Sequence, residues 1–220
     1  MLIGDYYMIL EIDKSEAMLS AEEPEDYSYE ITGRVLGLDD ECRRILAGRF
    51  KLFYMDVNAA MDEHRSIFEL FDGRAQTLDY FYGIYETTDS TIQLAPSLVR
   101  LLDDEPFLGN VLILDRLEIL PKFRGCNLGL LVMRRLIERF RHGAELVAIK
   151  PFPLQFECSM PSRDRWREQL KLSELGSRQD QATAKLRRHY GKLGFKHMRG
   201  SPFMFRLAER PLPKVSALEK

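Results

Sequence analysis

The chain has 220 residues, of which 45% are hydrophobic and 30% charged, a composition typical of one sizeable globular domain or two small ones. No stretch approaches the roughly 20 consecutive apolar residues that span a bilayer, and the N-terminal segment lacks the basic start of a secretory signal. Three cysteines are too few for a disulfide framework, so we expect a cytoplasmic protein with no membrane partner.

Charge is divided unevenly along the chain, although the total is only -2. Residues 1–120 contain 10 Lys/Arg and 25 Asp/Glu, whereas residues 121–220 contain 22 Lys/Arg and 9 Asp/Glu. The basic half is compatible with a polyanionic small molecule, with nucleic acid, or simply with solvated helix faces. We expect no nucleic-acid partner, because this half lacks interleaved aromatic residues and a known nucleic-acid-binding motif.

The N-terminal third shows short, separate patterns. Residues 1–26 have no clear periodicity. Alternating side chains predict strands over Tyr27–Leu36 and Phe50–Ala59. Between these strands, Asp39 is the predicted cap of a short helix over residues 41–50.

The middle of the chain favours helices. Apolar residues at helical spacing predict a helix over Arg65–Glu86 that breaks at Gly73. Residues 88–97 then indicate a turn, and residues 97–104 fit either a strand or a helix.

From Asn110 onward the patterns are longer. A nearly continuous apolar run predicts a central strand over Val111–Ile119, followed by an amphipathic helix over Leu128–Phe140 and a second buried strand over Glu145–Lys150. Residues 151–180 form a polar insertion with a predicted short helix over 163–172. The remaining predicted elements are a helix, two closing strands and a loose tail: Gln181–Leu193, Phe195–Met198, Phe203–Leu207 and the residues from Pro211 onward.

The loop between the first of these strands and its helix reads P-x-x-R-G-x-x-x-G, from Pro121 to Gly129, and carries Arg124 and Gly125. Backbone N–H groups at a helix start are unpaired and carry the positive end of the helix dipole, so they suit a phosphate. The loop matches neither a Walker P-loop nor GxGxxG. By itself it is compatible with an anion cradle or with an ordinary connection.

A second pattern ends the next helix and reads AKLRRHYGKLGF, from Ala184 to Phe195. Tyr190 lies four residues before Gly194 and therefore in the last turn of the predicted helix. The neighbouring His189 is expected to face solvent. Alone, this pattern fits a capped helix with an aromatic residue in the core.

Together the two patterns resemble the GNAT superfamily of N-acetyltransferases over residues 106–207. The resemblance rests on Leu117, Ile119, Pro121, Arg124, Gly125 and Gly129, with Leu186, Tyr190, Gly194 and Phe195. Asn127 stands where the family usually has the middle glycine of its loop, and Asn tolerates left-handed backbone better than other non-glycine residues. The implied fold is α/β (α+β), a mixed central sheet flanked by helices, in which Val111–Ile119 splays from Glu145–Lys150.

The resemblance implies acetyl-CoA as a cosubstrate and no metal. Acetyl-CoA would lie in the splay, with its pantetheine paired to the strand backbone near Leu117 and Ile119 and its pyrophosphate in the loop. The implied loop residues are Arg124, Gly125, Cys126, Asn127, Leu128 and Gly129.

The resemblance also implies direct attack of an amine on the thioester, with Tyr190 protonating the departing CoA thiolate. Asp115 is the first candidate base and Glu118 the second. Because side chains alternate along a strand, we expect these two carboxylates on opposite faces, with Asp115 on the face of Leu117 and Ile119. Either carboxylate could instead be a structural partner of an arginine.

We expect one domain over residues 1–220, in which 106–207 bind acyl-CoA. The divergent half, 1–105, and the insertion, 151–180, would shape the acceptor site, and the acidity of the first half would suit a cationic amine. The alternative function is a non-catalytic GNAT-like module that binds acyl-CoA or a protein partner. The sequence does not decide between a monomer and a homodimer.

Overall fold

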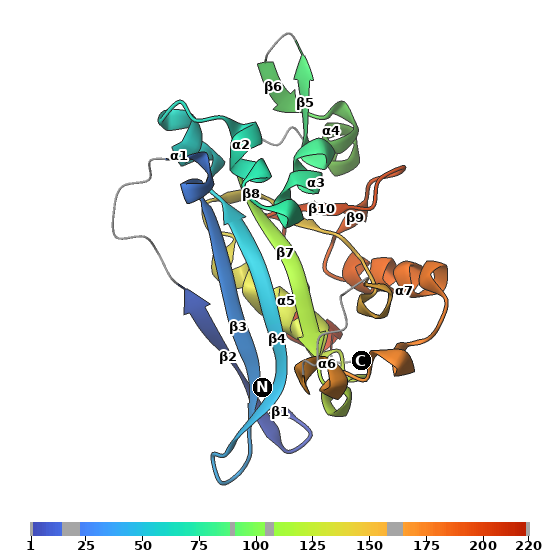
Figure 1. Ribbon diagram of the computed structural model, residues 1–220. Coiled ribbons are helices and arrows are strands. Elements are labelled where there is room, and N and C mark those ends of the chain that lie inside the picture. Colours follow the sequence, from blue (N-terminus) through green and yellow to red (C-terminus); the bar gives the residue numbers. More distant parts are fainter. Residues whose placement is uncertain (1, 15–22, 89–90, 104–107, 158–164, 219–220) are drawn as a thin grey trace.

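The computed structural model describes residues 2–14, 23–88, 91–103, 108–157 and 165–218. Within these ranges the centre is an 8-stranded mixed sheet of order β1-β2-β3-β4-β7-β8-β10-β9, with helices on both faces (Figure 1). The predicted α+β architecture with a mixed central sheet is therefore confirmed. No helix of the described ranges has the length and apolar character needed to cross a membrane.

The first wing of the sheet is antiparallel and consists of β1 (Leu2–Ile3), β2 (Tyr6–Lys14), β3 (Ser28–Leu38) and β4 (Arg44–Met55). The strand predicted after residue 26 is confirmed as β3, preceded by the 3-10 helix η1 (Pro24–Tyr27). No pattern had predicted β1 and β2.

The short helix predicted after Asp39 is wrong. The Asp39 carboxylate accepts hydrogen bonds from the backbone N–H groups of Glu41 and Arg43, at 3.0 and 2.9 Å. Cys42 takes a left-handed conformation, with φ of 59°. An aspartate that bonds its own following backbone competes with the helix and closes a turn instead. The following residues pair with β3 as the start of β4.

Four helices follow β4: α1 (Val57–Asp62), α2 (Ile67–Asp72), α3 (Ala75–Ile84) and α4 (Pro96–Leu102). The predicted break at Gly73 is confirmed, and residues 97–102, which fitted either type, are helical. Where a turn was predicted, the chain forms a small separate hairpin of β5 (Tyr85–Thr88) and β6 (Thr91–Leu94).

The C-terminal half follows the prediction closely, with β7 (Asn110–Ile119), α5 (Leu128–Phe140), β8 (Ala144–Ile149), α7 (Gln179–Gly191), β9 (Lys196–His197) and β10 (Met204–Leu207). The insertion contains η3 (Leu154–Phe156), α6 (Arg165–Gln169) and η4 (Leu172–Leu175). Of the helix predicted there, residues 163–164 lie outside the described residues. The tail is not loose, because α8 (Val215–Leu218) buries Leu218 in the core.

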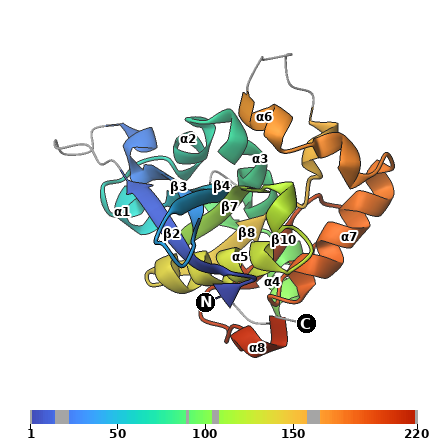
Figure 2. The same ribbon diagram turned by 90° about the horizontal axis from the view of Figure 1, so that it is seen from below.

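The sheet separates two hydrophobic cores, and β7 contributes to both. Val111 and Ile113 pack with the helices α1 to α4 on one face. Leu112 and Leu114 pack with α5 on the other face (Figure 2). This alternation places β7 in the middle of the molecule, with both faces covered.

The predicted splay of the central strands is present. β7 and β8 are parallel and pair from Asn110 with Ala144 to Leu114 with Ile149. Beyond Leu114, β7 continues along β4 as far as Ile119, but without β8. Among the described strands, none pairs with this edge of the second half of β7.

Candidate functional site

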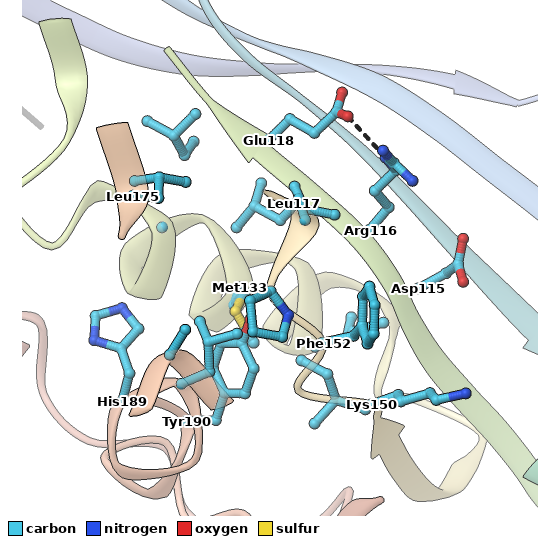
Figure 3. Close-up of a pocket in the computed structure, with 18 of the residues that line it drawn as sticks. Asp115, Arg116, Leu117, Glu118, Met133, Lys150, Phe152, Leu175, His189 and Tyr190 are labelled. Carbon is cyan, nitrogen blue, oxygen red and sulfur yellow. Dashed lines mark hydrogen bonds and ion pairs between the residues drawn. The ribbon is translucent and has the colours of Figure 1, made fainter. Parts of the chain in front are cut away.

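A pocket of about 350 Å³ opens where β7 and β8 separate (Figure 3). The second half of β7 forms one wall, and α5, residues 149–155, the insertion and α7 form the others. Most of the lining is apolar and includes Leu117, Met133, Leu154, Leu170, Leu175 and Leu186. An apolar cleft with a few polar groups is the usual form of a small-molecule site.

The predicted cofactor-binding residues divide into two groups. Leu117, Ile119, Arg124 and Gly129 line the pocket. The lining does not include Gly125, Cys126, Asn127 or Leu128, and Leu128 is only 2% exposed in the core beneath α5. The structure thus brings the strand edge and the first turn of α5 to the pocket, with the rest of the loop beside it.

The loop has the backbone expected of an anion cradle. After η2 (Pro121–Phe123), Gly125 takes φ of +85° and Asn127 takes φ of +57°. Asn127 is the N-cap residue of α5 and adopts a left-handed backbone conformation there. This is the conformation that asparagine tolerates better than other non-glycine residues. The N–H groups of the first turn of α5 carry no intrahelical bonds.

Arg124 links this loop to the insertion. Its Nε donates to the Ile119 carbonyl at 2.8 Å, and its Nη2 donates to the Leu170 carbonyl at 2.5 Å. Burial lowers the pKa of Arg124 below its usual value, but a guanidinium keeps its charge. The side chain therefore supplies positive charge to the pocket while holding the insertion over the end of β7.

A β-bulge changes the direction of the candidate base. Lys51 of β4 pairs with Arg116 and the next residue, Leu52, pairs with Leu114, so Asp115 is an extra residue in β7. The extra residue reverses the alternation, and Leu117 joins Leu114 on the α5 side. The expectation that Asp115 and Glu118 face opposite sides is wrong. Both project to one side of β7, and Leu117 projects to the other (Figure 3).

Asp115 keeps one free oxygen. Its Oδ2 pairs with the Lys51 Nζ at 3.0 Å, and the Asp115 side chain is 18% exposed. Its Oδ1 has no hydrogen-bond partner among the described residues. Asp115 is among the residues that line the pocket.

Glu118 has both oxygens engaged. Arg116 Nε donates to one oxygen at 2.7 Å and Trp166 Nε1 donates to the other at 2.6 Å, and Glu118 is only 8% exposed. Arg116 also donates two bonds of 2.7 Å to Glu157, which hold the pKa of Glu157 below its usual range. The Arg49 guanidinium lies 4.3 Å from the centre of the Trp166 ring. This network fastens the insertion to β7.

Tyr190 lies on the last turns of α7 and lines the pocket, as its predicted role requires. Burial raises its pKa to about 12, so the phenol is protonated at neutral pH. His189 also lines the pocket and is half-buried, which corrects the expectation that it faces solvent. Burial, with a smaller effect of Lys192 and Lys185, lowers the pKa of His189.

Several residues that line the pocket carry no motif in the sequence. Lys51, Lys150 and Phe152 line the pocket together with Asp115. Lys150 directly follows the buried strand β8, which was the one available signal, whereas nothing near Lys51 distinguished it from other strand lysines. Within the described ranges, no group of three or more His, Cys, Asp or Glu residues is arranged to hold a metal ion.

No family model, curated protein or solved structure matches this chain. The pocket therefore has to be interpreted from its own residues.

Proposed function

We propose that the protein is an acyl-CoA-dependent N-acetyltransferase that moves an acetyl group from acetyl-CoA to an amine by direct attack. The observation that carries the proposal is the pocket itself. It joins the edge of β7 that β8 does not cover, a glycine loop that opens α5, and the partly buried side chain of Tyr190. We propose further that this GNAT-like acyltransferase acts in the cytoplasm.

The pocket offers complementary groups for each part of acetyl-CoA. Backbone groups of β7 between Asp115 and Ile119 have no partner strand toward β8, so pantetheine amides could pair with them as an added strand does. Apolar residues around this edge would cover the pantetheine methylenes. The α5 N-terminus and Arg124 would attract the pyrophosphate.

The chemistry requires one acid and one base. The amine nitrogen attacks the thioester carbonyl carbon, the carbon–sulfur bond breaks, and the sulfur leaves with the bonding electrons. Tyr190 donates its phenolic proton to the CoA thiolate and regains a proton from solvent. Asp115 Oδ1, directly or through water, takes the proton that the amine loses, so the products are an amide and the CoA thiol.

We assign the base to Asp115 and not to Glu118. Among the described residues, the Asp115 oxygen Oδ1 is unengaged, whereas one Glu118 oxygen accepts from Arg116 and the other from Trp166 of the insertion. A carboxylate that already accepts two charge-assisted or buried hydrogen bonds is a weak proton acceptor, because protonation would break one of them.

A second candidate function is a GNAT-like module that binds acyl-CoA without catalysis or works through a protein partner. The observation that favours it is the double use of Arg124, whose guanidinium already bonds two backbone carbonyls. Release of free CoA thiol during incubation with acetyl-CoA and a panel of amines separates the two. Amine-dependent release supports the enzyme, and binding without release supports the module.

Isothermal titration of acetyl-CoA into the full chain tests the site. A Gly129→Glu variant should bind at least about 10-fold more weakly than a Gly129→Gln variant, because the added carboxylate repels phosphate at the start of α5. The two side chains have nearly equal size, so their difference isolates the charge. Absence of binding to the unmodified protein at millimolar acetyl-CoA overturns the proposed function.

A further inference from the structure

The two ends of the pocket differ in chemistry. At one end, Asp115 and Lys150 lie on either side of Phe152, and the opposite end contains Leu175 and His189 (Figure 3). Lys51 joins Asp115 at the charged end. The charged end lies beside the bulge of β7, where the proposed base would meet the acceptor.

Two lysines dominate this end. Lys51 Nζ is 3.0 Å from Asp115 Oδ2, and their side chains are 24% and 18% exposed. Lys150 Nζ is 3.0 Å from Asp79 Oδ2, but the Asp79 side chain is 64% exposed and does not line the pocket. Arg116 also lines the pocket, but its charge is paired with Glu118 and Glu157. The remaining lining at this end carries two positive charges and one negative charge.

Aromatic rings limit where the lysines can move. Lys51 Nζ lies 5.1 Å from the centre of the Phe53 ring, and Lys150 Nζ lies 5.8 Å from that of Phe203. Both rings are buried, so each ammonium has an apolar support on one side. The Lys51 side chain is 24% exposed and the Lys150 side chain is 37% exposed, so Lys51 is the more desolvated cation and interacts more strongly with an anion that enters the pocket.

A plain cationic amine is a poor match for this end. As its nitrogen approaches Asp115, it meets Lys51, which is already paired with that carboxylate, and Lys150. Like charges at this range repel each other more strongly in a partly buried site than in water. An amine that brings its own carboxylate would instead pair that carboxylate with the lysines while its nitrogen faces Asp115.

We propose that the acceptor is a free amino acid, with Lys51 and Lys150 binding its carboxylate and Asp115 facing its amino group. This inference rests on the proposed acetyl transfer and narrows its substrate class. Because Lys51 and Asp115 are in direct contact, their partner groups on the ligand must be neighbours, as they are across one α-carbon. Phe152 and Ile149 form an apolar wall beside this end, which suits an apolar side chain.

The test compares three compounds for each amino acid: the free acid, its amide, and the amine that lacks the carboxyl group. CoA thiol release is measured with the full chain and acetyl-CoA. We expect kcat/KM for at least one free amino acid to exceed that of its amide and its amine by about 10-fold or more. The amide has the less basic amine, so its larger neutral fraction works against this outcome.

Equal or faster release with the amides or amines would overturn the proposal, and so would no release with any amino acid by a protein that binds acetyl-CoA. In both cases, if the protein still binds acetyl-CoA, the proposed CoA site is retained and only the proposed acceptor is overturned. A protein that does not bind acetyl-CoA at all would overturn the proposed function first.

Two variants locate the carboxylate contact. Lys51→Gln and Lys150→Gln should each lower kcat/KM for the free amino acid by about 10-fold to 100-fold. The rate with the amine that lacks the carboxyl group should stay the same or rise, because a repelling charge is gone. A structural role would lower both rates together. Lys214→Gln, at an exposed lysine outside the pocket lining, should leave all rates unchanged.

Discussion

At the scale of single residues, two carboxylates on one strand have different environments. Asp115 and Glu118 are three positions apart and project to the same side of β7 (Figure 3). Glu118 is buried under the insertion, where Arg116 and Trp166 satisfy both of its oxygens. Asp115 lies at the bulge, and within the described part of the chain only one of its oxygens has a partner. Hydrogen-bond occupancy therefore separates a structural carboxylate from a candidate base better than residue type does.

The proposed proton donor Tyr190 can be tested by a single substitution that removes only its hydroxyl group. Tyr190→Phe should lower kcat by about 10²-fold to 10³-fold, because the leaving thiolate loses its proton donor. The affinity for acetyl-CoA should change little, since the ring and its packing remain. Below pH 10 the phenol does not titrate, because its pKa is raised to about 12, so the pH–rate profiles of variant and parent should have the same shape there.

Steady-state kinetics with varied acetyl-CoA, followed by thiol release from pH 6 to 10, checks both statements. An unchanged kcat in Tyr190→Phe would remove this residue from the proposed chemistry. A loss of acetyl-CoA affinity alone would assign it a binding role.

At the scale of elements, the insertion is the part of the chain that completes the pocket. Leu170, Leu172 and Leu175 form one of its walls, and three separate groups hold that wall in place. These are the Arg124 bond to the Leu170 carbonyl, the Trp166 bond to Glu118, and the Arg116 pair with Glu157. A short helix such as α6 has little stability by itself, so these tertiary contacts decide its position.

The Glu157 pair predicts a pH dependence of stability. Arg116 holds the pKa of Glu157 below its usual value, so the pair stabilises the folded state above about pH 4.5. That stability is lost as the pH falls through the lowered pKa. Glu157→Gln should therefore cost about 1 kcal/mol of unfolding free energy at pH 7, and the difference from the parent should become smaller as the pH falls below about 4.5.

Urea unfolding at pH 7 and pH 3, followed by tryptophan fluorescence, measures this difference. Trp166 is the single tryptophan of the chain and lies in the insertion, so its emission reports the element concerned. Glu168→Gln, at an exposed glutamate on the same helix, serves as the control and should change stability little at either pH. An equal loss for Glu157→Gln at both pH values would contradict the ion-pair explanation.

At the scale of the whole molecule, the pocket joins parts that are far apart in the sequence. Its lining runs from Lys51 in the acidic half to Tyr190 in the basic half. β7 lies between two cores and carries the pocket on its unpaired half. A ligand there would contact the sheet, α5, α7 and the insertion at once.

Ligand binding should therefore stabilise the fold as a unit. At acetyl-CoA concentrations of about 100 times Kd, binding contributes about 2.7 kcal/mol. For a chain of this size, we expect the melting temperature to rise by about 5 to 10 °C. Differential scanning calorimetry over a range of acetyl-CoA concentrations measures this rise. The Gly129→Glu variant should lose the rise in melting temperature, and Gly129→Gln, with a side chain of nearly equal size, is its control. An identical shift in the Gly129→Glu variant would place acetyl-CoA away from the α5 loop.

The elements that frame the pocket were predictable from local sequence patterns. β7, α5, β8 and α7 follow from hydrophobic periodicity and from glycines and prolines at their ends, all of which are local properties. The left-handed backbone at Asn127 and the place of Tyr190 near the end of α7 were predictable for the same reason. Local patterns act over one or two turns, and these elements are long enough to show them.

Which side chains come into contact depends on strand register and packing, which local patterns do not specify. The region after Asp39 was predicted to be a helix, but strand pairing makes it part of a hairpin. One extra residue at Asp115 reverses the side to which the later side chains of β7 point. The pairs Lys51–Asp115 and Arg116–Glu157 join residues that are distant in the chain, and their contact depends on strand register and on how the insertion packs. Register is set by the summed packing of whole faces, so no local pattern could have predicted those contacts.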